Sequence, residues 1–362
     1  MKTADKHSTG GVADTTTLIA VPLAAACSVP ILKMSGRGLG FTGGTIDKLE
    51  SIPGFCVDIS AAQAIEQVKK IGLAVMSQSD KLTPADKKLY ALRDVTATID
   101  SIPLIAASIM SKKIAAGANT IILDVKCGSG AFMRTLEDAR KLADTMVRIG
   151  KIVGRETAAI ISSMDQPLGS HIGNSLEVIE AIEVLKGNIT GELLDVSLEL
   201  AARMMLLTNN CSSYDEAISK LNRALNQRSG LIKLAEMIEA QGGDHSIIDD
   251  YSLFPQPCCT IELTSDQDGF LTEIMTADVG RAFVAAGGGR LRKNDQIDYS
   301  AGIIMDVRLG NRIRKGDRLA MIQAADINKA KQAKDMLRDA LIISSQKTEA
   351  KPVIIDRIGI DQ

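Results

Sequence analysis

Residues suited to binding an anion lie close together near the start of the chain, in "KHSTGGVADTTTL" at 6–18. Lys6 supplies a positive charge, and Ser8 and the later threonines supply hydroxyl groups. The two glycines let backbone N–H groups approach a ligand, and the threonines come where a helix is expected to begin, whose dipole favours an anion. This pattern predicts one side of a phosphate site.

A second glycine-rich stretch, "SGRGLGFTGGT" at 35–45, directly follows the apolar run "VPILKM". Three of its glycines match the dinucleotide pattern G-x-G-x-x-G, but that pattern opens a helix directly, whereas "TGGT" prolongs the loop here. Ser35 and Thr45 place hydroxyl groups at its two ends, which suits a single phosphate better. The stretch alone also fits a tight connection; together with "KHSTGG" it predicts an anion cradle.

His7 is one of three histidines in the chain. An isolated histidine is more often packed or solvated than catalytic, but this one stands between Lys6 and Ser8. A phosphate beside it would raise the pKa of the imidazole. We therefore predict an imidazolium that serves as an acid or hydrogen-bond donor.

Two further polar residues, Ser108 and Lys112, are four positions apart in a stretch that reads as a helix. Ser101 suits the cap of this helix and Pro103 its first turn. Residues four apart share one helix face, so both side chains point the same way. The spacing alone shows no more than that.

Apolar, β-rich runs alternate with helical stretches through the first part of the chain, which is typical of a mostly parallel α/β sheet flanked by helices. Strands are expected at 29–34, 73–78, 120–126 and 157–163. Helices dominate from residue 174 until "QGGDHS" at 241–246. We predict one α/β phosphate-binding domain in two parts, at 1–83 and 115–255. A helical unit at 84–114 lies between them, and a C-terminal β-rich module follows at 256–362.

In the C-terminal module, "CCTIELTSDQDGFLTEIM" and "VRLGNRIRKGDRLAMIQA" each read as two strands around a turn. The module resembles the barrel-sandwich folds of lipoyl and biotinyl domains. It has no lysine within a modification motif at the expected hairpin tip. We therefore expect it to pack against the rest of the protein as a structural α+β module.

Composition excludes several functional classes for these 362 residues. Lys plus Arg number 42 and Asp plus Glu 44, so a net charge of -2 gives no electrostatic reason to bind nucleic acid or a membrane surface. No apolar run reaches the ~20 residues of a membrane helix. Six cysteines without paired spacing predict a reducing compartment, the cytoplasm.

The sequence resembles the pyrimidine-nucleoside phosphorylases, relatives of thymidine phosphorylase, along essentially its whole length. The resemblance rests on long strings, among them "KMSGRGLG", "TGGTIDKLESIPGF", "LDVKCGSGAFM", "MDQPLG", "GGGR" and the run from "LTPADKKLYALRDV" to "SKKIAAG". It implies a pentosyltransferase that catalyses reversible phosphorolysis. Phosphate attacks the anomeric carbon of a pyrimidine nucleoside, and the free base and an α-sugar 1-phosphate are released.

The resemblance also implies roles for individual residues. Phosphate is held by residues that match Lys6, His7, Ser8, Thr17, Lys33, Ser35 and Thr45. The pyrimidine is held by residues that match Arg93, Ser108 and Lys112, with His7 at its 2-oxo group. A lysine at position 33 matches the branch that accepts both ribose and deoxyribose, and a potassium ion is bound at positions that match Ala13, Thr15, Leu168, His171 and Glu180.

Some positions depart from the family pattern. Ala13 stands where the family has glycine, His171 where it has a small apolar residue, and Phe41 where it has histidine. An alanine at position 13 strains the loop if its φ must be positive. Because two departures fall at the cation positions, potassium binding is a weaker expectation than phosphate binding.

Relatives carry a helical segment before "DKHSTGG" that forms most of a small α domain and much of a homodimer interface. The helices of 84–114 are then a remnant whose apolar residues lack partners, and dimerisation is doubtful. We weigh an active phosphorylase of broad or thymidine-only specificity against an inactive nucleoside- or phosphate-binding remnant. A phosphoribosyltransferase is a third reading, but we find no acidic motif for diphosphate and magnesium.

Overall fold

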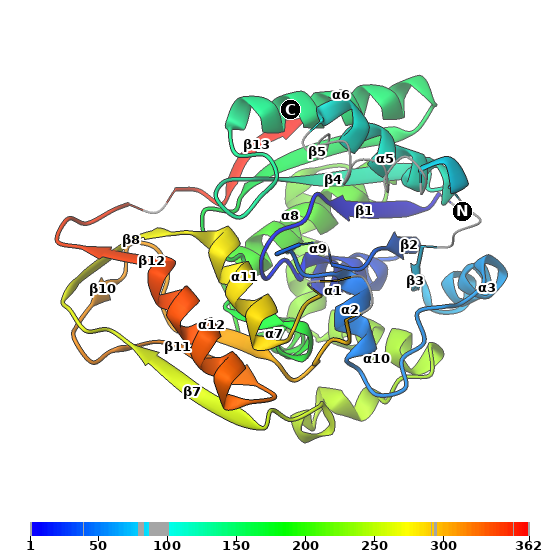
Figure 1. The fold of residues 1–362 in the computed structure, drawn as a ribbon. Helices are drawn as coiled ribbons and strands as arrows, with labels where there is room; N and C mark the ends of the chain where they lie inside the picture. The colour runs from blue at the N-terminus through cyan, green and yellow to red at the C-terminus, as the bar shows by residue number, and fades with distance from the viewer. Residues whose placement is uncertain are drawn as a thin grey trace.

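The computed structural model describes residues 2–38, 40–78, 83–86, 101–290, 292, 295–349 and 351–360. Figure 1 shows a main sheet covered by helices, with a smaller β-rich part beside it that is formed by the later residues of the chain. No helix in the described ranges is both long and apolar enough to cross a membrane.

The main sheet has the strand order β13-β5-β4-β1-β2-β3. Its strands are β1 (Ala4–Ser8), β2 (Ile31–Ser35), β3 (Leu73–Ser77), β4 (Thr120–Cys127), β5 (Glu156–Ser163) and β13 (Ile354–Ile358). Neighbours pair in parallel except at the β13–β5 edge, which is antiparallel. The predicted, mostly parallel sheet is therefore confirmed. Its central strand β1 was not among the strands expected from the sequence.

One group of helices packs around α1 (Thr16–Ala26). Ten of the eleven residues of α1 are buried, because the sequence "TTLIAVPLAAA" is apolar on every side after its first two threonines. The surrounding helices and the two short 3-10 turns that follow them are α7 (Asn174–Lys186), α8 (Glu192–Leu207), α9 (Tyr214–Asn226), α10 (Ser229–Ala240), η1 (His245–Ile248) and η2 (Tyr251–Leu253). The expected run of helices from residue 174 is confirmed.

Helices α5 (Ile102–Ala115) and α6 (Leu136–Ile152) pack against each other, and α6 also packs against β4 and β5. Helix α6 is amphipathic and buries Ala139, Leu142, Ala143 and Met146 on one face, at the spacing expected for a helix on a sheet. Two shorter helices, α2 (Thr45–Glu50) and α3 (Ala61–Ile71), follow β2, and α3 packs against β3.

Helix α5 is the described part of the expected helical remnant. Ala106, Ile109 and Met110 are buried in one apolar cluster with residues of β4 and α6. Ile102, Ile105 and Ile114 are half-buried at the border of the same cluster. The expectation that the apolar residues of this helix lack partners is therefore wrong for residues 102–114.

The C-terminal module contains two antiparallel sheets, with strand orders β6-β9-β11-β7 and β10-β8-β12. Its elements are β6 (His171–Gly173), β7 (Cys259–Thr264), β8 (Gly269–Ile274), α11 (Thr276–Ala286), β9 (Gly302–Met305), β10 (Arg312–Ile313), β11 (Arg318–Ala324), α12 (Ile327–Asp339) and β12 (Leu341–Ser344). The predicted strands exist, but β7 and β8 lie in different sheets, as do β10 and β11. The two expected hairpins are therefore crossings between sheets.

Two segments tie this module to the main sheet. Strand β6 comes from the α/β part of the sequence but pairs with β9. In the opposite direction, β13 comes from the end of the chain and pairs with β5 (Figure 1). The boundaries drawn from the sequence therefore divide elements that pair across them.

Candidate active site

The residues predicted to bind an anion gather near the carboxyl ends of β1 and β2, beside β4. Ser8 pairs in register with Asp124, and because Ala4 pairs with Ile31, Ser8 and Ser35 stand at the same level of neighbouring strands. Helix α1 begins just after the loop that follows β1. Ligands of open α/β sheets bind at such carboxyl ends, where a helix N-terminus also attracts anions.

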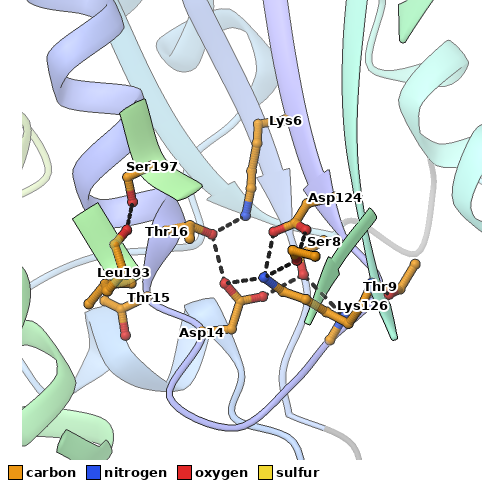
Figure 2. Close-up of polar contacts among 12 residues, drawn as sticks. Lys6, Ser8, Thr9, Asp14, Thr15, Thr16, Asp124, Lys126, Leu193 and Ser197 are labelled. Atoms are coloured by element: carbon orange, nitrogen blue, oxygen red, sulfur yellow. Dashed lines mark hydrogen bonds and ion pairs between the residues drawn. The ribbon is translucent and has the colours of Figure 1, made fainter. Parts of the chain in front are cut away.

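Four side chains of this region form one hydrogen-bonded group (Figure 2). The Lys6 ammonium donates to Thr16 Oγ1, and that hydroxyl donates to Asp14 Oδ1 at 2.7 Å. Ser8 Oγ donates to the other carboxylate oxygen of Asp14 and accepts from the Gly10 N–H at 3.2 Å. Asp14 thus orients the two hydroxyl groups that flank the lysine.

The charges of this group depend on one another. Burial lowers the pKa of Lys6, although Asp14 and Asp124 oppose this shift. Burial opposes ionisation of Asp14, but Lys126, Lys6 and Lys48 outweigh it and hold the pKa of Asp14 far below its usual range. Asp14 is therefore a carboxylate at any pH at which the protein works.

Lys33 and Lys113 both lie close to the carboxylate of Asp5, a residue of β1. Lys113 Nζ donates to Asp5 Oδ2 at 2.8 Å and to the Met34 carbonyl at 2.9 Å. Lys33 Nζ donates to the Lys6 carbonyl at 2.5 Å and lies 3.8 Å from Asp5 Oδ1. Burial, with the positive charge of Lys113 next, holds the pKa of Lys33 well below its usual range. An arriving anion would favour its protonated form.

The other predicted phosphate residues lie around the same strand ends. Ser35 ends β2, and its buried hydroxyl has no hydrogen-bond partner among the residues that the structure describes. Thr17 is buried in the first turn of α1, and Thr45 is the first residue of α2. An unpaired buried hydroxyl is costly, so a ligand that accepts a hydrogen bond from Ser35 fits this position.

The glycine-rich loop before α2 folds back closely on itself. A Cβ atom on Gly44 would lie 2.0 Å from the Gly38 backbone nitrogen, so the close approach requires glycine. Asp47 accepts from the Gly38 N–H at 2.7 Å and from Arg290 Nη1 at 2.9 Å. The loop is therefore fixed between α2 and the C-terminal module.

His7 lies in β1 between Lys6 and Ser8, and its surroundings in the protein alone disfavour the charged imidazole. Burial, followed by the positive charges of Lys113, Lys33, Lys112 and Lys6, holds the pKa of His7 well below its usual range. This shift belongs to the protein without phosphate and favours the neutral imidazole. The imidazolium was expected beside a bound phosphate and stays a prediction. A neutral imidazole still donates one hydrogen bond.

The pair predicted on one helix face is present in α5. Lys112 Nζ donates to Ser108 Oγ at 2.8 Å and pairs with Asp86 Oδ2 at 2.8 Å. The charge of Lys112 also acts on His7, so the structure brings these predicted base-side residues together. Arg93, the third predicted base-binding residue, lies outside the described residues.

The five predicted potassium positions also come together. Gly169 N–H donates to the Ala13 carbonyl at 3.1 Å, and the Glu180 carboxylate accepts the Ser170 N–H at 2.6 Å. Ala13 has φ +52°, which confirms the expected strain at this position.

Four of the five predicted potassium positions already have a hydrogen-bonded protein partner. The Thr15 hydroxyl donates to Glu177 Oε2 at 2.5 Å, and the Leu168 carbonyl accepts from Arg308 Nη2 at 3.1 Å. His171 Nδ1 lies 3.5 Å from Glu180 Oε1. A cationic guanidinium at one of the carbonyls fits an alkali ion poorly. Potassium binding stays a prediction, and no step of the mechanism depends on it.

Several buried charged residues of the site were not singled out from the sequence. They are Asp14, Lys48, Asp124, Lys126 and Glu177. Lys48 pairs with Glu177 at 2.6 Å and donates to the Asp14 carbonyl at 2.9 Å. One signal was present: "TIILDVK" places two opposite charges in an otherwise apolar strand, and buried charges occur in pairs.

Comparison with known proteins defines the class first. Residues 1–230 match the a/b domain of the glycosyl transferase family, and residues 270–344 match the pyrimidine nucleoside phosphorylase C-terminal domain. Anthranilate phosphoribosyltransferase from Thermus thermophilus shares the fold, with a TM-score of 0.50 at 16% identity over 66% of this chain and 78% of that one.

Two curated relatives narrow the class. A pyrimidine-nucleoside phosphorylase of Staphylococcus aureus is 53% identical over 320 residues, which cover 88% of this chain and 74% of the relative. A pyrimidine-nucleoside phosphorylase of Geobacillus stearothermophilus is 51% identical over 355 residues, which cover 98% of this chain and 82% of the relative. The chain belongs to the pyrimidine-nucleoside phosphorylase family.

Proposed function

We propose that this protein catalyses the reversible phosphorolysis of pyrimidine nucleosides. The observation that carries the proposal is the arrangement of Lys6, Ser8 and Thr16 around one strand end, with the Ser35 hydroxyl on the next strand unpaired within the described part of the chain. Membership of the phosphorylase family supports this assignment. The substrates are inorganic phosphate and uridine, thymidine or deoxyuridine.

The phosphate side of the site positions the nucleophile. The Lys6 ammonium and the hydroxyls of Ser8, Thr17, Ser35 and Thr45 would hold phosphate against the anomeric carbon, close to in line with the departing base. Holding two reactants in this geometry converts a bimolecular step into an effectively unimolecular one. The phosphate oxygen forms the new C–O bond as the glycosidic C–N bond breaks.

The base side stabilises the leaving group. The pair of electrons from the broken C–N bond goes to the pyrimidine, which develops negative charge at its carbonyl oxygens. Lys112 and Arg93 would stabilise this charge directly, and the neutral His7 would donate an N–H to the 2-oxo group. Donors that meet charge formed only in the transition state raise the rate rather than the affinity.

Lys33 is the residue that we propose for substrate range. Lys33 is a residue of β2, and its buried ammonium donates to the Lys6 carbonyl on β1. A donor in this position would accept both ribose and deoxyribose nucleosides. The six free cysteines support action in a reducing compartment, the cytoplasm.

The test is phosphate-dependent release of uracil from uridine. Purified protein is incubated with uridine with and without phosphate, uracil is followed by its absorbance, and the sugar product by phosphorus NMR. We expect uracil and α-ribose 1-phosphate in equal amounts, and only with phosphate. No release would favour the inactive remnant, whereas release without phosphate would indicate hydrolysis; either result overturns the proposal.

A further inference from the structure

A fully buried lysine, Lys126, lies beside the residues proposed to hold phosphate and is not itself one of them. Lys126 stands on β4, and its ammonium pairs with Asp124 Oδ2 at 2.7 Å and lies 3.8 Å from Asp14 Oδ1. It also donates to Ser162 Oγ at 3.0 Å, and Ser162 donates to Asp124 Oδ1 at 2.6 Å. The ammonium thus lies between two carboxylates, as Figure 2 shows.

The two carboxylates have different surroundings. Asp124 contacts Ser162 and Lys126, which are both fully buried. Asp14, in contrast, accepts hydrogen bonds from the hydroxyl groups of Ser8 and Thr16, which lie on the phosphate side with Lys6. The ammonium of Lys126 therefore reaches the phosphate side through Asp14.

Asp14 needs this counter-charge. A buried carboxylate without a compensating cation either loses its charge or moves toward solvent. Lys6 and Lys48 are the other cations that act on Asp14. The ammonium of Lys6 is the group that must serve phosphate, and that of Lys48 pairs with Glu177 at 2.6 Å. When Lys6 pairs with the anion, Lys126 remains to hold Asp14 ionised and in place.

We propose that Lys126 is a positioning residue for phosphate, which acts through Asp14 to orient Ser8, Thr16 and Lys6. The backbone supports the same coupling, because Lys126 N–H donates to Thr9 Oγ1 at 2.9 Å, next to Ser8. This inference rests on the proposed function. It also explains why the interior keeps charged groups at β4: apolar residues of similar volume would stabilise the fold at least as well.

The experiment compares Lys126→Met with the wild-type protein. Uracil release gives kcat and the separate KM values for phosphate and uridine, and titration calorimetry gives direct phosphate affinity. We expect the phosphate KM to rise about tenfold or more, the cost of disturbing hydrogen bonds to a charged group, while the uridine KM changes less than about twofold. If a folded Lys126→Met protein had the same phosphate KM as the wild-type protein, the inference would be overturned.

A second variant covers the case in which Lys126→Met does not fold. Asp14→Asn keeps the shape of the side chain and leaves Lys126 paired with Asp124. It should also raise the phosphate KM selectively, and an unchanged value would overturn the inference. Wild-type protein without phosphorolysis in this assay would count against the proposed function instead, and phosphate calorimetry would still compare the variants.

The matched control is a buried charged network in another part of the sheet. Glu199 on α8 is buried and pairs with Arg203 and with Arg357 of β13. Glu199→Gln should lower the melting temperature without a selective change in either KM. If Glu199→Gln and Lys126→Met shift the phosphate KM equally, the effect is general destabilisation and the positioning role is wrong.

Discussion

The phosphate side and the base side of the site are built in different ways. On the phosphate side, residues from β1, β4 and α1 are joined by buried ion pairs and hydrogen bonds, and Lys6 is 1% exposed. On the base side, Lys112 contacts Ser108 on its own helix and Asp86, and its side chain is 17% exposed.

This difference has a chemical meaning. Phosphate must be held in one place before the sugar arrives, so its ligands are fixed by strands and by charges that cannot leave the interior. The base acquires charge only as the bond breaks, so its ligands need to meet it late in the reaction. Substitutions on the two sides should therefore separate phosphate affinity from turnover.

The largest effect is expected for Lys6→Ala. Removing the cation of the phosphate side should lower kcat/KM for phosphate by about a thousandfold, at the upper end of the loss for one preorganised charged donor. Asp14 keeps Lys126 and Lys48 as counter-charges, so the fold should survive. Steady-state kinetics with varied phosphate, and circular dichroism as the folding control, make the measurement. A loss of less than tenfold would place phosphate elsewhere.

The next largest effect is expected for Lys112→Ala, which should lower kcat rather than phosphate affinity. Loss of a charge-assisted contact made in the transition state costs on the order of 3 kcal/mol, or about a hundredfold in kcat. Phosphate affinity by calorimetry should stay within about twofold, because the proposed role of Lys112 is to meet charge that forms on the base. Arg93→Ala should behave in the same way. Unchanged turnover in either variant would remove that residue from the site.

A smaller effect is expected for Lys33→Met, which tests substrate range. Asp5 keeps its 2.8 Å contact with Lys113, so the buried carboxylate is not left unpaired. We expect the ratio of kcat/KM for uridine to that for thymidine to fall by about tenfold, the value of one hydrogen bond to a charged group. The wild-type protein should use both nucleosides comparably. A thousandfold preference of the wild-type protein for thymidine would contradict the assignment.

The residues proposed for the phosphate side were easier to predict from the sequence than the strands and ion pairs that hold them. Ser8, Ser35 and Lys6 were identified because hydroxyl, glycine and lysine residues form a local pattern. The strand β1 was missed because "ADKHS" carries no β-branched or aromatic residue; β2 and β4 supply its hydrogen bonds from distant positions. The pairing of Asp14 with Lys126 is likewise invisible in a local pattern.

Two other differences have similar causes. The turn residues around Asp268 and Lys315 look alike in a hairpin and in a crossing between two sheets, because only the partners of the strands differ. The charge of His7 was predicted from its neighbours in sequence, whereas Lys112 and Lys113 reach it from α5. Local patterns thus pointed to the residues proposed as ligands, and long-range packing sets the charge and support of those residues.

The smallest effect concerns the strained loop of the phosphate side. Ala13 has φ +52° and is buried, and Ser28 has φ +65° and is exposed. An L residue in this conformation costs about 1 kcal/mol or more relative to its usual backbone, and glycine removes that cost. Ser28→Gly should therefore raise the free energy of unfolding by about 1 kcal/mol.

Ala13→Gly should stabilise the protein by less than Ser28→Gly, because it also removes a buried methyl group worth about 0.8 kcal/mol. We expect a net change within about 0.5 kcal/mol, measured by urea unfolding of both variants side by side. The Ala13 carbonyl keeps the Gly169 N–H in either case, so the phosphate KM should not change. If Ala13→Gly were as stabilising as Ser28→Gly, the methyl group would contribute nothing. A raised phosphate KM would instead show that the strain itself holds the loop in its binding position.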